Sequence, residues 1–397
     1  MQQISGRVED TINMKKKILI VTSVWGFLAK FGKEDVWILQ ESGYEVHYAS
    51  NKNNPIYQFP ENIYETMDVV FHDIDIWQSP FGIKHNARAV KQIRDLVKTE
   101  GISMIHCHTP SGGLVARLAG IGLPVQVIYT VHGFHFYRGA GKIHNLIYHS
   151  IETFLSCFTD IIVTVNREDY KAACKMHQRK GTFQIPGVGL DREFFHETSL
   201  EQRKAAKEKL GMKDRFFIIS VGELRENKNP EVIIRALAVL KEKGMDISTF
   251  RYGLLGAGKQ EEQLRSLILE KGLSDNVVFY GYQSDVRPYL QAADILAFPT
   301  IREGLGMAAL EAMAMGVPVL AADNRGTREF MIEKENGYVC MQNNPSEYAR
   351  LIEKMYQEQD KWCTNTEKRL QIRKSTEKFD KKNTITVMRE VYGRAIN

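Results

Sequence analysis

The chain has 397 residues, of which 43% are hydrophobic and 25% are charged. This length is too great for one ordinary hydrophobic core and suits two domains of somewhat under about 200 residues each. The net charge of +5 is small and the basic residues are dispersed along the chain. Because no nucleic-acid-binding motif accompanies this charge, we expect no nucleic-acid partner.

The cysteines argue against an oxidising compartment. They are odd in number and lack CxxC spacing, which disfavours a disulfide framework or a zinc module. The five are Cys107, Cys157, Cys174, Cys340 and Cys363. No apolar run approaches the about 20 residues that cross a bilayer, and the first residues lack the apolar core of a signal peptide. These features predict a cytoplasmic protein without a transmembrane span.

The first half of the chain alternates short apolar runs with helical patterns. Residues 1–13 are polar, and we treat them as an N-terminal extension outside the fold. Strands that alternate with helices predict a parallel, doubly wound sheet, here in a first domain of residues 14–189. Its expected strands are 17–22, 46–49, 69–74, 104–107, 125–131 and 161–165.

A cluster of glycine and proline at 185–191 predicts a linker. The alternation then restarts, so residues 190–380 are expected to form a second Rossmann-like domain, followed by a C-terminal helix over 381–397. The expected strands of the second domain are 216–221, 252–255, 277–280, 295–298 and 317–321. Two such domains predict a ligand site in the cleft between them, at the carboxyl ends of the strands.

The most informative segment runs from Ala297 to Val319. Gly304 and Gly306 precede a helix, so backbone N–H groups and the helix dipole together predict an anion site. The helix is apolar nearly all round and therefore buried, yet Glu311 lies in its middle. A buried carboxylate needs a partner, which is either a pair of sugar hydroxyls or, in a structural role, a nearby arginine or lysine.

This segment, EGLGMAALEAMAMGVPV, resembles the E-x7-E segment of the retaining, GT-B-fold glycosyltransferases of family 4. Glu303 and Glu311 stand in the two glutamate positions. The resemblance covers residues 15–395 and is strongest over 216–330. It implies two Rossmann-like domains, a nucleotide sugar bound in the cleft between them, and a C-terminal helix that crosses back to the first domain.

A second segment, 222–229, resembles the phosphate-binding segment of the same family. Lys228 stands in the lysine position. Glu223, however, stands where the family has an arginine, so one diphosphate contact is missing. Arg225 or Arg302 would have to replace it.

The resemblance also assigns roles at the nucleotide sugar. Glu311 would hold the ribose hydroxyls, and Glu303 would contact the donor sugar. The residues that it places at this site are Gly222, Arg225, Lys228, Gly256, Gly258, Tyr282, Ser284, Val286, Glu303, Gly304, Leu305, Gly306, Met307 and Glu311.

The first domain contributes the acceptor side. His132 ends a predicted strand beside a glycine, and the resemblance places it at the reaction centre. His132, Glu303 and Lys228 are therefore the candidate catalytic residues. The expected acceptor-side residues are Gly26, Phe27, His132, Gly133, Phe134 and Arg138.

Residues 134–148 combine aromatic side chains with Arg138 and Lys142. This composition suits a membrane interface or a lipid-linked acceptor, and a helix packed at the rim of the cleft explains the aromatic residues equally well. Four segments resemble the bacterial branch that builds capsular, exopolysaccharide and related lipid-linked glycans. They are 109–120, 130–141, 159–170 and 325–330.

Two motifs raise the question of a metal ion. His106, Cys107 and His108, with His132 and His135 nearby, invite a zinc site. Alternation along a strand sends His106 and His108 to the face opposite Cys107, which disfavours it.

The second motif, Asp73-Ile74-Asp75, matches the D-x-D that holds a divalent metal in the other large glycosyltransferase fold. Its place between early strands of the first domain indicates ordinary surface carboxylates. We expect neither a metal nor another cofactor.

The sequence therefore predicts a retaining glycosyltransferase that uses a nucleotide diphosphate sugar, with a UDP-sugar as the expected donor. The acceptor is expected to be polyprenyl-diphosphate-linked, and the protein to bind the inner face of the cytoplasmic membrane peripherally. Two alternatives stay open. They are a UDP-sugar epimerase of the same fold and a non-catalytic nucleotide-sugar sensor, the latter because Glu223 replaces the arginine.

Overall fold

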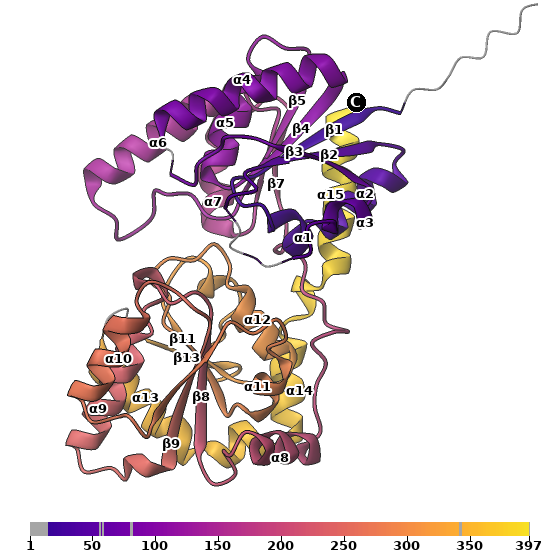
Figure 1. The fold of residues 1–397 in the computed structure, drawn as a ribbon. Coiled ribbons are helices and arrows are strands. Elements are labelled where there is room, and N and C mark those ends of the chain that lie inside the picture. The colour runs from indigo at the N-terminus through magenta and orange to yellow at the C-terminus, as the bar shows by residue number, and fades with distance from the viewer. Residues whose placement is uncertain (1–14, 55–56, 58, 80–81, 341–343, 397) are drawn as a thin grey trace, which may run out of the picture.

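The computed structural model describes residues 15–54, 57, 59–79, 82–340 and 344–396. Figure 1 shows two α/β domains, one above the other, with the last helix running along the first domain. The proposed N-terminal extension, 1–13, lies outside the described residues. Among the helices of the described part of the chain, none combines the length and apolar character that a membrane span requires.

The first domain contains a seven-stranded parallel sheet in the order β3-β2-β1-β4-β5-β6-β7. Its central strands are buried along most of their length because helices cover both faces of the sheet. The strands are β1 Lys17–Val21, β2 Glu45–Ser50, β3 Val69–Asp73, β4 Ile102–His108, β5 Gln126–Val131, β6 Ile161–Thr164 and β7 Gly181–Gln184. Sequence analysis missed β7, whose residues are of mixed polarity and only partly buried at the edge of the sheet.

Helices cover both faces of this sheet. They are α1 Phe27–Phe31, α2 Lys33–Glu41, α3 Ile63–Thr66, α4 Ile83–Glu100, α5 Pro110–Gly120, α6 Lys142–Ser156 and α7 Arg167–Ala173. Helix α5 packs closely on the sheet because Gly113 has no side chain, and a Cβ there would lie 2.4 Å from the ring of Tyr129. Buried Arg117 stacks on the same ring, 4.0 Å from its centre, and pairs with Glu152 of α6 at 2.8 Å. This arginine therefore ties α6 to the domain.

The second domain repeats the architecture with a six-stranded parallel sheet in the order β10-β9-β8-β11-β12-β13. The strands are β8 Phe216–Val221, β9 Phe250–Leu255, β10 Val277–Gly281, β11 Ile295–Phe298, β12 Val319–Ala322 and β13 Gly337–Cys340. The helices are α8 Leu200–Lys209, α9 Glu231–Glu242, α10 Glu261–Glu270, α11 Arg287–Ala292, α12 Met307–Ala314, α13 Pro345–Gln357 and α14 Thr366–Lys374. Strand β13, again a short edge strand, was not predicted.

The chain crosses between the domains twice, and the two crossings lie side by side. The amide of Leu190 donates to the carbonyl of Phe379 at 2.9 Å, and the amide of Lys381 donates to the carbonyl of Leu190 at 3.0 Å. The side chain of Lys381 also pairs with Asp191 at 2.6 Å. Paired in this way, the two segments form one connection.

After the second crossing, helix α15, Lys381–Ile396, packs against α2 of the first domain. The hydroxyl of Tyr392 lies 2.8 Å from Nδ1 of His106 and donates to Asp35 at 3.0 Å. Arg389 pairs with Glu41. The predicted fold class, two doubly wound domains with a C-terminal helix that returns to the first, is confirmed (Figure 1).

Candidate functional site

The loop between β11 and α12 contacts the first domain at two glycines, Gly304 and Gly133, which have no side chains. A Cβ on Gly304 would lie 1.9 Å from the carbonyl oxygen of His132. Gly133 has a φ of +127°, and a Cβ there would lie 3.3 Å from Cα of Gly304. Gly306 adopts a φ of +105° immediately before α12 begins at Met307. Glycine is therefore required here both for backbone conformation and for close approach.

Glu303 lies beside Lys228, and its position follows from the backbone. Asn227 donates from its side-chain amide to the carbonyl of Arg302 at 2.9 Å and accepts from the Arg302 amide at 3.1 Å. This reciprocal pair holds the loop after β11 against the loop after β8. The ammonium of Lys228 lies 2.5 Å from the Glu303 carboxylate, and both side chains are 23% exposed.

Glu311 lies in the middle of α12, half-buried, while its helix neighbours are buried. Within the part of the chain that the structure describes, Glu311 has no ion pair and no side-chain hydrogen bond. Burial raises the pKa of Glu311 to about 7, and the positive charge of Lys30 in α1 opposes this shift. The structural alternative, in which Glu311 pairs with a neighbouring arginine or lysine, has no support in the described residues.

The glycines of the β8 and β9 loops bring these loops into contact. A Cβ on Gly256 would lie 1.9 Å from the carbonyl of Gly222, and one on Gly258 would lie 2.2 Å from the carbonyl of Leu224. Gly222 has a φ of +149°, and the aliphatic part of Lys228 covers it. These three glycines therefore let the two loops pack closely against each other, next to the side chain of Lys228.

The two candidate replacement arginines differ in their surroundings. Arg225 is 54% exposed, with its Nε 3.5 Å from the Glu223 carboxylate. Arg302 is partly buried, and its guanidinium lies 5.5 Å from the ring centre of Tyr137 in the first domain. Burial lowers the pKa of Arg302, with Arg325 and Arg225 adding to the shift. Among the described residues no carboxylate forms an ion pair with Arg302.

Tyr282, Ser284 and Val286 lie beyond the carboxyl end of β10, at the edge of the second sheet. Tyr282 is 48% exposed, and Val286 packs on the core. The structure describes no hydrogen bond or ion pair that links these residues to Lys228 or Glu303.

Tyr57 of the first domain was not predicted from the sequence as a site residue. Burial raises the pKa of Tyr57, and the negative charges of Glu223 and Glu303 across the domain interface raise it further.

On the acceptor side, His132 lies beside His108, with Nε2 of His132 3.1 Å from Nδ1 of His108. The ring of Phe27 stands 5.3 Å from both imidazoles. A small cavity of about 20 Å³ opens here, with room for about one water molecule. Asp35, Ile185 and Thr384 also line it. Burial lowers the pKa of His132 to about 4, so the imidazole is neutral near pH 7.

The other predicted acceptor-side residues have separate positions. Gly26 packs against Tyr57, since a Cβ there would lie 2.7 Å from Cβ of Tyr57. Phe134 is buried in the core, 1% exposed, and stacks on Phe136. Its side chain is therefore not available to an acceptor in this structure. Arg138 is exposed. The hydrogen bond from Arg328 lowers the pKa of Asp323 in the second domain, and the charge of Arg138 adds to that effect.

The candidate metal ligands are held by hydrogen bonds. Suitable atoms of Asp35, His106 and His108 lie within 4.8 Å of one another. Both ring nitrogens of His106 are engaged, however, by Tyr392 at 2.8 Å and by Thr130 at 2.7 Å.

The D-x-D carboxylates are engaged elsewhere. Asp73 accepts from the amide of Lys52 at 2.9 Å. Asp75 pairs with His85 at 2.7 Å and with Arg88 at 2.5 Å. Neither carboxylate contacts Glu303 or Lys228.

Comparison with known proteins places this geometry in a family. The sequence model of glycosyl transferases group 1 matches residues 202–379, and that of the glycosyl transferase 4-like domain matches residues 16–166. A protein of Bacillus subtilis strain 168 assigned as the glycosyltransferase EpsD is 35% identical over 385 residues, which cover 96% of this chain and 97% of that protein. This chain belongs to the glycosyltransferase family.

More distant relatives include two with descriptive names. The Escherichia coli UDP-Gal:α-D-GlcNAc-diphosphoundecaprenol α-1,3-galactosyltransferase is 24% identical, covering 65% of this chain and 67% of that enzyme. The capsular polysaccharide biosynthesis glycosyltransferase CapM of Staphylococcus aureus is 23% identical, covering 80% and 82%. Among solved structures, HepE of Anabaena in complex with UDP-glucose superposes with a TM-score of 0.74 at 18% identity, over 95% of this chain and 99% of that one. This similarity confirms the GT-B fold of the glycosyltransferase.

Glu311, which has no partner among the described residues, predicts a stability difference that depends on pH. Its pKa is about 7 in the folded protein, against an ordinary value of 4.5. Between these values the folded state holds a proton that the unfolded state has lost, so the free energy of unfolding falls as the pH rises through this range. Glu311→Gln removes this effect. We expect its melting temperature to exceed that of the wild type by a few degrees at pH 8, and the advantage to vanish near pH 4.5.

Differential scanning fluorimetry at the two pH values measures this difference. Glu390→Gln, at an exposed position of α15, is the matched control and should show no pH-dependent change. Asp35 also has a pKa raised to about 7 by burial, but it is present in both proteins and cancels in the comparison. An equal melting-temperature difference at both pH values would show that Glu311 is not destabilised by burial.

Proposed function

We propose that this glycosyltransferase moves a sugar from a UDP-sugar to a polyprenyl-diphosphate-linked acceptor, with retention of anomeric configuration, in bacterial surface polysaccharide biosynthesis. The observation that carries the proposal is the position of the Lys228–Glu303 pair. It lies beside the amino end of α12, next to the glycine contact that brings His132 of the other domain to the same place. The names of CapM and of the Escherichia coli galactosyltransferase support the polysaccharide and lipid-linked assignments.

Glu311 is the proposed anchor of the nucleotide. A half-buried carboxylate without a partner is costly, and two ribose hydroxyls would supply the donors that the described residues do not. Glu303 would accept from a hydroxyl of the donor sugar while Lys228 holds the carboxylate in place. The complex of HepE with UDP-glucose supports a UDP-sugar as the donor class, by similarity of fold.

The leaving diphosphate needs positive charge, and we assign that charge to Lys228, to the amides of 304–307 and to Arg302. Arg225 is exposed and lies near Glu223, so it is less suited to the task. Arg302 is partly buried, lies in the adjoining loop and has no carboxylate paired with it among the described residues. Fixed donors that stabilise a developing charge usually lower the barrier of such reactions more than any other single effect. We therefore infer that the leaving group is stabilised without a metal ion.

Retention without a covalent intermediate is the simplest interpretation of this site. The candidate nucleophiles among the described carboxylates are engaged, Glu303 by Lys228 at 2.5 Å and Asp35 by Tyr392 at 3.0 Å. The acceptor hydroxyl oxygen would then form the new bond to the anomeric carbon on the face from which the diphosphate leaves, as the bond to the diphosphate breaks and the hydroxyl proton passes to the departing diphosphate. Neutral His132 would orient the reacting groups rather than carry a charge.

A donor panel tests the proposal. The protein is incubated with UDP-, GDP- and ADP-sugars, with and without a polyprenyl-diphosphate-linked acceptor. Nucleotide release and products are read by liquid chromatography, which separates epimers, coupled to mass spectrometry. We expect UDP release only with a UDP-sugar and acceptor together, unchanged by EDTA. Isomerised sugar without acceptor would support the epimerase, and binding without turnover would support the sensor. Loss of activity in EDTA, restored by manganese, would return Asp73 and Asp75 to consideration.

The ribose assignment predicts that Glu311→Ala weakens UDP binding. Charge-assisted hydrogen bonds contribute about 1.5 to 3 kcal/mol, so the dissociation constant should rise about 10- to 100-fold. Isothermal titration calorimetry with UDP measures it, with Glu390→Ala as control. Unchanged UDP affinity in Glu311→Ala would contradict the assignment.

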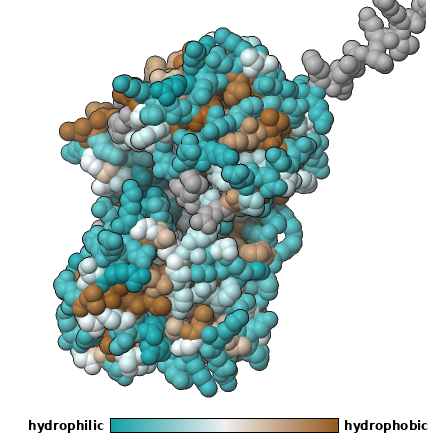
Figure 2. All heavy atoms as spheres, in the orientation of Figure 1, coloured by the Kyte–Doolittle hydropathy of each residue, from teal (hydrophilic) through white to brown (hydrophobic). Residues whose placement is uncertain are grey.

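Helix α6 offers a surface for the proposed membrane contact. Ile143 is 76% exposed, Leu146 is 68% exposed and Phe154 is 59% exposed, and their spacing puts them along one side of the helix with Ile147 and Ile151. Figure 2 shows hydrophobic surface at this outer end of the first domain. The only acidic residue of α6, Glu152, is engaged with buried Arg117. With exposed Lys142 at its start, the helix suits an anionic bilayer surface.

Replacing Arg138 and Lys142 by serine should weaken binding to anionic vesicles. Each basic residue near such a surface contributes about 1 kcal/mol, so the partition constant should fall by about one to two powers of ten. Co-sedimentation with vesicles of phosphatidylglycerol and phosphatidylcholine, at low and high salt, measures this. The control replaces exposed Lys204 and Lys209 of α8, in the second domain, by serine. Equal binding of both variants, or no binding by the wild type, would leave a soluble acceptor.

A further inference from the structure

A buried arginine of the second domain reaches into the first domain. Arg325 follows β12 and is 5% exposed. Its Nη1 donates to Oδ1 of Asp169 at 2.7 Å and to the carbonyl of Phe136 at 3.2 Å, and its Nη2 donates to the carbonyl of Phe134. The pair therefore joins the loop after β12 to two separate segments of the first domain.

Asp169, at the start of α7, is 1% exposed and extends this cluster. Its Oδ2 accepts from the side-chain amide of Asn166 at 2.7 Å and from the amide of Phe134 at 3.3 Å. The Asn166 amide also donates to the carbonyl of Gly304 at 3.0 Å. The two carboxylate oxygens of Asp169 thus hold two loops of the second domain, one through Arg325 and the other through Asn166.

The segments held in this way adjoin the reaction centre directly. Phe134 follows His132 by two residues, and Gly304 follows Glu303. A buried ion pair keeps its geometry because either charge, left alone away from water, would be strongly unfavourable. Since its two members belong to different domains, the cluster is complete only while the domains are together.

We propose that Arg325 and Asp169 are positioning residues for sugar transfer, which hold the His132–Phe136 segment against the Glu303–Leu305 loop. This ion pair, called the latch below, favours one arrangement of the two domains. The covalent connection at Leu190 and Lys381, in contrast, permits them to move relative to each other. The proposal deepens the function proposed above and rests on it only in that sugar transfer takes place between the two domains. It does not depend on the identity of the donor or of the acceptor.

The neighbouring contacts provide a comparison within the same loop. Arg328 is 40% exposed, pairs with Asp323 at 2.7 Å and reaches Glu168 of the first domain at 3.5 Å. Exposed ion pairs of this kind contribute little. Arg328→Gln is therefore a matched control that changes the same charge, in the same loop, at the same interface.

The test compares Asp169→Asn, Arg325→Gln, the double variant and Arg328→Gln. Three quantities are measured, namely the radius of gyration by small-angle X-ray scattering, UDP affinity by calorimetry, and kcat and KM for transfer with the donor and acceptor found in the panel. We expect each single latch variant to have a larger radius of gyration and at least a 30-fold lower kcat, with UDP affinity within twofold of the wild type. The double variant should resemble the single ones, because removing the second partner of a broken pair costs little more.

The outcomes separate the latch from simpler roles. An unchanged radius of gyration in both single variants overturns the latch, with or without a transfer assay. If the control Arg328→Gln loses as much kcat as the latch variants, the Arg325–Asp169 pair has no specific role. The same holds if the losses of the two single variants add in the double variant. A general loss of fold is recognised by a lower melting temperature together with lost UDP binding, and Arg325→Lys, which keeps the charge, should then recover part of the kcat if the latch holds. No UDP binding by the wild type contradicts the proposed donor and leaves the scattering comparison to decide the latch.

Discussion

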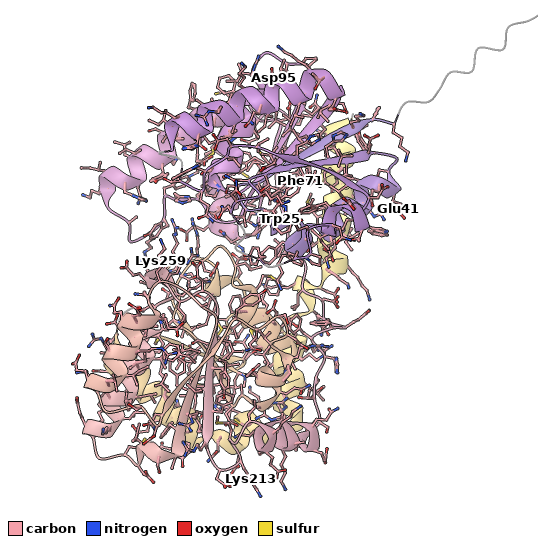
Figure 3. The ribbon with its side chains drawn as sticks, viewed as in Figure 1. Trp25, Glu41, Phe71, Asp95, Lys213 and Lys259 are labelled. Atoms are coloured by element: carbon pink, nitrogen blue, oxygen red, sulfur yellow. The ribbon has the colours of Figure 1, made fainter. Side chains whose placement is uncertain are left out.

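The two domains of this glycosyltransferase are in direct backbone contact beside the candidate site, where Gly304 of the second domain meets His132 of the first. Gly304 lies against the carbonyl of His132 so closely that a single added methyl group would stand 1.9 Å from that oxygen. Because no side chain intervenes, the loop that carries Glu303 and the strand end that carries His132 share one small region. This approach brings His132 of the first domain close to the loop that carries the Lys228–Glu303 pair of the second. Figure 3 shows that side chains of both domains fill the boundary around it.

Two different links hold the domains in this relation. In the first, the crossings at Leu190 and Lys381 pair through backbone hydrogen bonds, and α15 continues into the first domain, where Tyr392 bonds His106 and Asp35. In the second, the Arg325–Asp169 pair joins loops that have no covalent connection nearby. A covalent connection permits relative motion of the domains, whereas a buried ion pair favours one arrangement. The combination suits an enzyme that must admit two substrates and then exclude water from them.

Much of the fold follows from local patterns. Continuous apolar runs such as Ile18–Val21 are strands because a parallel sheet with helices on both faces buries them completely. The glycines at 304 and 306, read as a helix-start loop, have the conformations and close contacts that only glycine permits. Edge strands β7 and β13 escaped prediction, since a short strand with one neighbour is defined by its hydrogen bonds to that neighbour rather than by its own composition. Glu303, Glu311 and Lys228 were found through a motif, and their assigned roles stay predictions.

The sequence by itself therefore determined the fold class, the segments of the site and the residue types that could bind an anion and a sugar. Tertiary structure alone decided which charges meet. Asp169 reads in the sequence as an ordinary first-turn acid of a helix, and its partner Arg325 is 156 residues away. Phe134, which sequence analysis assigned to the acceptor side, is buried. Arg225 lies near Glu223, whereas Arg302 has no carboxylate partner among the described residues. These contacts depend on how the two domains pack against each other, and local sequence patterns carry no information about that packing.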